Sequence, residues 1–142
     1  MRTTKFITSA LGALAAAGLS LAAMAADYAV IVNKANASSV DKDTVAKIYT
    51  GHMKEWSGGT AVAPVDLPDD SPVRASFSSD VLGKTVSNIK ALWAQAMFSG
   101  KAVPPKQVGS DDEVKKFVAA NAGAIGYIKP ASVDDSVKAV LK

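Results

Sequence analysis

Two spacings of hydrophobic residues alternate along this chain, and each predicts one kind of element. Short runs rich in β-branched residues are typical of buried strands, whereas apolar residues three and four positions apart are typical of helices. The runs that we interpret as strands cover residues 28–33, 61–66, 124–128 and 137–141. Helical spacing covers residues 41–51, 72–82, 85–99 and 110–121. The resulting order, β-α-β-α-α-α-β-β, predicts an α/β sandwich with a mainly parallel sheet.

Each predicted helix has a start signal, a stop signal and one apolar face. The expected N-caps include Asp41, Ser71 and Ser110, and the expected helix-ending glycines are Gly51, Gly83 and Gly100. The side chains expected to point inward are Val45, Ile48, Tyr49, Val73, Phe77, Val81, Ile89, Leu92, Trp93, Ala96, Met97, Val114, Phe117 and Val118. Because Pro64 lacks a backbone donor, we expect its strand to lie at an edge or to contain a bulge.

The first 25 residues have the composition of a secretory signal peptide. A short basic end is followed by an apolar run rich in alanine and by the small-x-small sequence Ala23-Met24-Ala25. The alternative is a membrane anchor, but no basic stop-transfer cluster follows the run. We therefore expect cleavage after Ala25, a single domain over residues 26–142 and a periplasmic location. The chain has no cysteine, so no disulfide stabilises that domain.

Charge does not indicate a nucleic-acid partner. The chain has 16 Lys and Arg against 13 Asp and Glu. Removal of Arg2 and Lys5 with the signal peptide leaves 14 against 13, which is a net charge of +1. Neither a basic run nor basic residues interleaved with aromatic ones occur, and these are the marks of a nucleic-acid surface.

Catalytic, cofactor and metal signatures are missing from the sequence. His52 is the only histidine, and the chain contains none of the common nucleophile, zinc or phosphate-loop motifs. We expect no enzyme and no cofactor, although a mechanism that uses carboxylates alone stays open. The paired acids Asp69-Asp70, Asp111-Asp112 and Asp134-Asp135 are interpreted as structural, because negative charge stabilises a helix start. Trp56 is interpreted as the edge of a core rather than a binding aromatic.

One helix start carries a candidate binding site. In V65-D-L-P-D-D-S-P-V-R-A-S-F77, Ser71 is a good N-cap and Pro72 suits the first helical position. Arg74 then lies in the first turn, where a cation meets the positive end of the helix dipole. A bound oxyanion would explain it, held by the Ser71 hydroxyl, the backbone N–H groups of Val73 and Arg74, and the Arg74 guanidinium. The alternative is an ordinary capped helix with Arg74 in water.

The order of several segments resembles the phosphate-binding periplasmic proteins of ABC transporters. These segments are V-A-K-I-Y-T-G-H-M-K-E-W, then A-V-A-P-V-D, then the serine-led helix start, then A-I-G-Y-I. The resemblance covers residues 28–142 and implies one lobe of a two-lobed, type II periplasmic-binding-protein fold, with a small mixed, mainly parallel sheet flanked by helices. It implies a solute-binding protein for phosphate or a similar oxyanion.

The resemblance also implies which residues bind the anion. In the family, the segment after the second strand reads roughly Arg-Ser-Asp-x-Ser-Gly-Thr-Thr and wraps the phosphate. Asp69 matches the aspartate and Ser71 the second serine, but the family's arginine falls on Leu67 and its Gly-Thr-Thr on Pro72, Val73 and Arg74. One arginine is therefore lost before the cap and one appears after it. We expect Arg74 to swing back over the cap, so that Asp69, Ser71, Val73 and Arg74 form the site.

A single lobe leaves the anion half exposed, so we expect weak binding unless a second chain completes the cleft. A homodimer that faces two caps across a shared groove would do so, and an ABC transporter permease or a sensor would then receive the ligand. The alternative is an interaction module that keeps the fold without the ligand and works through a surface around His52, Met53 and Trp56. An open pocket at Ser71 and Arg74 would favour binding, whereas an ion pair between Arg74 and Asp69 or Asp70 would favour the interaction module.

Overall fold

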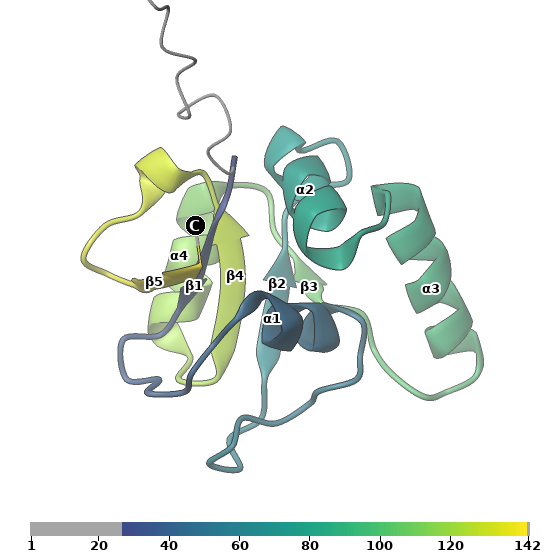
Figure 1. Ribbon diagram of the computed structural model, residues 1–142, viewed down its shortest axis with the longest axis horizontal. Helices are drawn as coiled ribbons and strands as arrows, with labels where there is room; N and C mark the ends of the chain where they lie inside the picture. The colour runs from purple at the N-terminus through teal and green to yellow at the C-terminus, as the bar shows by residue number, and fades with distance from the viewer. Residues whose placement is uncertain (1–26, 142) are drawn as a thin grey trace, which may run out of the picture.

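Five strands form the sheet at the centre of the structure, a computed structural model that describes residues 27–141 (Figure 1). The strands are β1 (Ala29–Val32), β2 (Ala63–Asp66), β3 (Lys106–Gln107), β4 (Ala124–Ile128) and β5 (Lys138–Leu141). Their order across the sheet is β3-β2-β4-β1-β5. β2 is parallel to β3 and β4, whereas β1 is antiparallel to β4 and β5. Four of the five strands therefore run in the same direction and β1 alone is reversed, so the sheet is mixed with mainly parallel strands, as predicted. The expected signal peptide lies outside the described residues.

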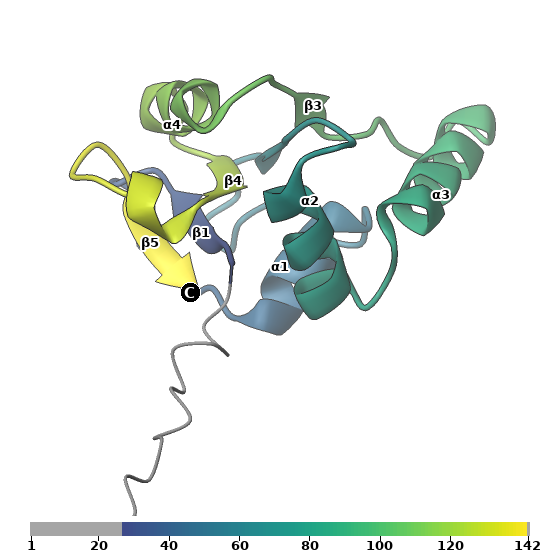
Figure 2. The same ribbon diagram turned by 90° about the horizontal axis from the view of Figure 1, so that it is seen from above.

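Helices cover both faces of the sheet (Figure 2). They are α1 (Lys42–Tyr49), α2 (Pro72–Phe77) with its π-helical continuation η2 (Ser78–Leu82), α3 (Val86–Phe98), α4 (Asp111–Ala120) and the short 3-10 helix η3 (Pro130–Ser132). α4 lies on one face, and α1 and α2 lie on the other, with α3 beyond them at the side. No helix among the described residues is long and apolar enough to cross a membrane.

The predicted inward faces of α1 and α2 are confirmed, but that of α3 is only partly so. All three expected residues are buried in α1 and in the α2–η2 segment, whereas in α4 Phe117 remains partly exposed. In α3 only Ile89 and Trp93 are buried. Leu92 and Ala96 are partly exposed, and Met97 is 52% exposed. The prediction for Met97 is wrong because α3 extends past the sheet, where no layer covers its last turn (Figure 1).

β2 is an interior strand, so the expectation that Pro64 places it at an edge is wrong. The neighbour on its outer side, β3, pairs only with Val65 and Asp66. Pro64 therefore needs no hydrogen bond on that side, which is how the sheet accommodates a residue without an N–H. No sequence pattern indicates β3, since a two-residue strand is too short to show a period.

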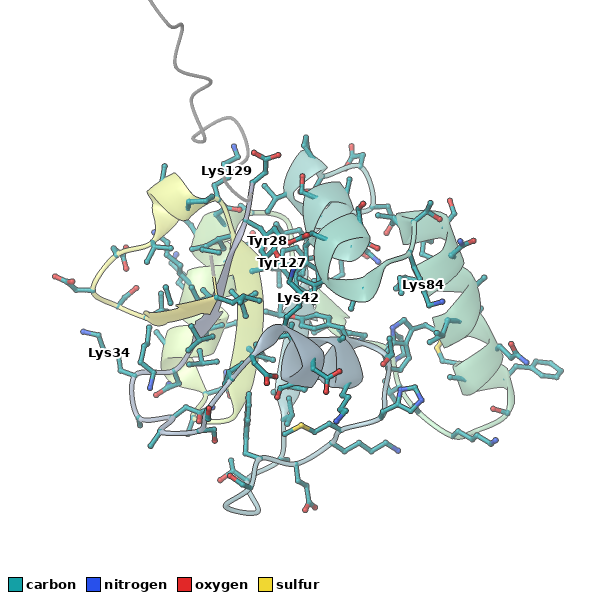
Figure 3. The ribbon with its side chains drawn as sticks, in the orientation of Figure 1. Tyr28, Lys34, Lys42, Lys84, Tyr127 and Lys129 are labelled. Atoms are coloured by element: carbon teal, nitrogen blue, oxygen red, sulfur yellow. The ribbon has the colours of Figure 1, made fainter. Side chains whose placement is uncertain are left out.

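Aromatic side chains tie α1 and α2 to β4. Phe77 of α2 stacks on Tyr127 of β4 with ring centroids 4.0 Å apart, and it meets Tyr49 of α1 edge-on at 4.9 Å. Tyr28, just before β1, also lies edge-on to Phe77, and Figure 3 labels Tyr28 and Tyr127 in the region between the sheet and α2. Trp56 is 4% exposed and donates from Nε1 to the Gly123 carbonyl at 2.9 Å, so its predicted core role is confirmed.

Candidate functional site

The candidate site begins where β2 ends and α2 starts. Ser71 has extended backbone angles and caps α2, since its hydroxyl oxygen accepts the Arg74 N–H at 3.3 Å. Pro72 occupies the first helical position, so the first free backbone donor is the N–H of Val73. That N–H makes no hydrogen bond within residues 27–141. The local sequence therefore forms the expected cap, and the N–H of Val73 has no acceptor among the described residues.

Arg74 folds back over the loop before the cap instead of pointing to water. The residue is 7% exposed, and its Nη1 donates to the Leu67 carbonyl at 3.0 Å and to Asp69 Oδ1 at 2.8 Å. Its Nη2 lies 3.9 Å from Asp66 Oδ2, which is beyond hydrogen-bond distance. The guanidinium thus lies beside Leu67, where the resemblance placed the family's arginine. It is also paired with protein carboxylates, which is the arrangement expected of the interaction module.

A buried carboxylate, Asp66, lies beneath this arginine. Asp66 is 7% exposed and accepts a hydrogen bond from the Tyr127 hydroxyl at 2.6 Å. The same hydroxyl accepts the Leu67 N–H at 3.2 Å. Burial raises the pKa of Asp66, although the Tyr127 hydrogen bond and the Arg74 charge act in the opposite direction. Burial, together with the negative charge of Asp66, also raises the pKa of Tyr127.

Sequence reasoning missed Asp66 and Tyr127 as parts of the site. Asp66 and Tyr127 are 61 residues apart in the sequence, and they meet only because β2 and β4 are adjacent in the sheet. A polar residue at the last position of a buried strand was the only local signal, since such a residue must find a partner in the fold.

Asp69 links the arginine to a second cation. Its Oδ2 lies 2.6 Å from Lys90 Nζ of α3, and its other oxygen accepts from Arg74. The hydrogen bond from Lys90, followed by the Arg74 charge, lowers the pKa of this exposed carboxylate. Two carboxylates, Asp66 and Asp69, therefore balance two cations around the start of α2. A ligand here has the free Val73 N–H and the Ser71 hydroxyl as donors and competes with Asp69 for Arg74.

The other residues singled out by sequence lie elsewhere. His52 is exposed, and its Nδ1 is 2.8 Å from Thr50 Oγ1. Trp56 is buried, so it cannot contribute to the expected surface with His52 and Met53.

The two acidic pairs beyond the site make internal contacts. Asp111 accepts from the Lys129 N–H at 3.1 Å and from Ser132 Oγ at 2.8 Å. Asp134 pairs with Lys115 at 2.9 Å. These contacts agree with structural roles. No group of residues able to hold a metal ion occurs in the described part of the chain.

Comparisons with known proteins place this geometry in context. The family model of the PBP superfamily domain matches residues 12–140. The phosphate-binding protein PstS of Bacillus subtilis is 31% identical over 113 residues, which are 75% of this chain and 32% of that protein.

Two crystal structures have the same fold over most of this chain. An ABC-type phosphate transport receptor from Vibrio cholerae is 26% identical with a TM-score of 0.63, over 80% of this chain and 45% of that one. A Clostridium perfringens protein with bound phosphate, proposed to be the substrate-binding protein of a phosphate ABC transporter, is 26% identical with a TM-score of 0.65, over 80% and 44% of the two chains. This chain therefore spans less than half the length of the relatives it matches.

Proposed function

This chain belongs to the PBP superfamily, and from that membership we propose that it is a solute-binding protein of the phosphate ABC transporter type that holds phosphate or a similar oxyanion at the start of α2. The family is one of transport proteins rather than enzymes. The observation that carries the proposal is the position of the Arg74 guanidinium. It donates to the Leu67 carbonyl near a Ser71-capped helix start, and Leu67 is the position onto which the resemblance places the family's arginine.

Each group at the site has a different part in binding the anion. The Ser71 hydroxyl and the Val73 N–H donate hydrogen bonds to its oxygens, and Arg74 supplies the positive charge. Asp69 accepts a hydrogen bond from the anion, which requires an anion that still carries a proton. Phosphate retains a proton near neutral pH and sulfate does not, so a carboxylate at this position favours phosphate.

A second surface is needed to bury the anion. On one lobe water competes with every donor, and charge-assisted hydrogen bonds to an exposed anion are weak. We propose that a second copy of this chain, or the permease or sensor that receives the ligand, closes the other side. The signal-like composition of residues 1–25 supports a periplasmic location for this assembly.

A second candidate function is an interaction module without a ligand. The ion pair between Arg74 and Asp69 favours it, because the cation that would hold the anion already has a carboxylate partner at 2.8 Å. In that case the network of Asp66, Asp69 and Arg74 serves only to fix the start of α2.

Calorimetric titration with phosphate, with sulfate as the control anion, separates the two functions. Arg74→Ala is a poor variant because it would leave Asp66 buried without a nearby cation. Ser71→Gly is better, since glycine at an N-cap costs only a few tenths of a kcal/mol while the hydroxyl is lost. We expect saturable heat with phosphate, little with sulfate, and weaker binding by Ser71→Gly.

Thr85→Gly is the matched control. The Thr85 hydroxyl oxygen caps α3 by accepting the Asn88 N–H, just as the Ser71 hydroxyl oxygen caps α2 by accepting the Arg74 N–H. This variant should leave phosphate binding unchanged. If a folded sample gives no heat of binding with phosphate at millimolar concentration, the oxyanion site is refuted and the interaction module remains.

A further inference from the structure

The last turn of α3 and the loop after it carry the most exposed large apolar side chains of the described residues. Met97 is 52% exposed, Phe98 is 97% exposed and Val103 is 84% exposed. A single exposed apolar residue needs no explanation, but a contiguous apolar patch marks an interaction site. α3 stands at one side of the molecule, away from β1 and β5 (Figure 1).

A groove of about 720 Å³ adjoins this patch. Its apolar wall includes Ile48, Met53, Val62, Trp93, Met97 and Val103. Trp93 is fixed in place, because its Nε1 donates to the Tyr49 carbonyl at 3.1 Å. Its ring lies so close to Gly51 that a Cβ there would be 3.2 Å from it. The Trp93 ring therefore has a fixed position in the wall of the groove. The groove lies near the start of β2, whereas the oxyanion site lies after the end of that strand.

The charges along the groove have one sign. Lys54 and Lys101 line it, and no acidic residue does. Lys54 Nζ donates to the Lys101 carbonyl at 3.1 Å, which joins the two loops that carry these lysines. Within residues 27–141 neither lysine forms an ion pair. A partner that covers the apolar wall would bring its own charges next to two unpaired ammonium groups.

We propose that this groove binds an amphipathic segment of another protein, one whose apolar face is flanked by carboxylates. Helices that lay an apolar face into a groove are a common mode of recognition. A small ligand would fill the groove but leave Phe98, which does not line it, exposed, whereas a protein segment is long enough to extend beyond the groove. A second copy docked through the same patch would bring its Lys54 and Lys101 against these two, and like charges disfavour that contact.

A pair of synthetic peptides tests the proposal. One is a helical peptide with leucines spaced three and four apart and glutamates beside them, and the other has lysines in place of the glutamates. The readouts are the amide shifts of this protein in NMR spectra and the anisotropy of a labelled peptide. We expect the acidic peptide to shift the amide resonances of residues around Met53, Trp93 and Val103. The basic peptide should bind more weakly.

Charge reversal gives the decisive comparison. The double variant Lys54→Glu with Lys101→Glu should weaken binding of the acidic peptide by about tenfold and strengthen binding of the basic peptide. The reason is that two exposed charge attractions become repulsions. The matched control, Lys34→Glu with Lys129→Glu, changes the net charge equally. Figure 3 shows both of these lysines on the side of the molecule away from α3, so this variant should bind both peptides nearly as the parent does.

Two results would overturn the inference. One is equal binding of the acidic and basic peptides, or none that saturates. The other is concentration-dependent dimerisation that Met97→Glu abolishes, which would make this patch a contact between copies. Neither result depends on phosphate, so the groove and the oxyanion site succeed or fail separately.

Discussion

Asp66 is the most costly side chain near the site, since an ionised carboxylate loses much of its hydration when it is buried. The Tyr127 hydroxyl compensates with a hydrogen bond of 2.6 Å, and Arg74 contributes its charge from 3.9 Å. Burial nevertheless raises the pKa of Asp66, so its ionisation at neutral pH works against folding. The folded state holds this proton more tightly than the unfolded state, and stability falls as pH rises through the raised pKa.

Tyr127→Phe should reduce the free energy of unfolding by about 2 kcal/mol near neutral pH, because it leaves the Leu67 N–H and the Asp66 carboxylate short of a partner. The loss of this donor also raises the pKa of Asp66 further. The penalty should therefore shrink as pH falls and Asp66 becomes protonated. Urea unfolding at about pH 5 and about pH 7.5 measures this difference.

Tyr49→Phe is the control for that experiment. The Tyr49 hydroxyl donates only to backbone carbonyls, those of Val65 at 2.8 Å and Ile125 at 3.2 Å. Its removal should cost the same at both pH values. Identical dependence of the free energy of unfolding on pH in the two variants would show that the pKa of Asp66 does not depend on the Tyr127 hydroxyl.

At the scale of elements, α4 packs on the sheet through a residue that has no side chain. A Cβ at Gly126 of β4 would be 2.5 Å from Val114 Cγ1 of α4 and 2.8 Å from Val65 Cγ1 of β2. Both distances are shorter than any normal contact between carbon atoms. The distance between helix and sheet is thus set by this glycine.

Gly126→Ala should lower the free energy of unfolding by about 1–3 kcal/mol, as overpacking of a core does. With Val114→Ala in the same chain, the combined loss should be smaller than the sum of the single losses, because the nearest clashing methyl is gone. Gly58→Ala, where a Cβ would meet nothing within 4 Å, should be nearly neutral. Additive losses at Gly126 and Val114 would contradict this account of the packing.

Elements also show where the sequence is informative. The faces of α1 and α2 and the Ser71 cap follow from residues close in sequence, and these predictions are confirmed. The spacing in α3 has the same form, yet Met97 is exposed, because a period identifies an apolar face without showing what covers it. The network of Asp66 and Tyr127 depends on which strands pair, and one sequence does not fix that order.

At the scale of the molecule, this chain spans less than half the length of the relatives it matches. If a second copy completes the cleft, phosphate binds the dimer better than the monomer and shifts the equilibrium toward the dimer. Sedimentation velocity should then show a larger species with phosphate than with sulfate, and Ser71→Gly should abolish the difference. A monomer that binds phosphate without associating would show that a second copy does not complete the cleft.

The place of β1 has a consequence for how the chain is made. β1 is the first strand of the described chain, yet it lies between β4 and β5, the last two. Whenever the chain is delivered from its N-terminus, the apolar run Ala29–Val32 has no partner until almost everything else has emerged. Contacts between such distant segments form slowly. In newly made chains β1 therefore stays unpaired for longer than any other strand. A chaperone that holds extended segments should recognise β1 first.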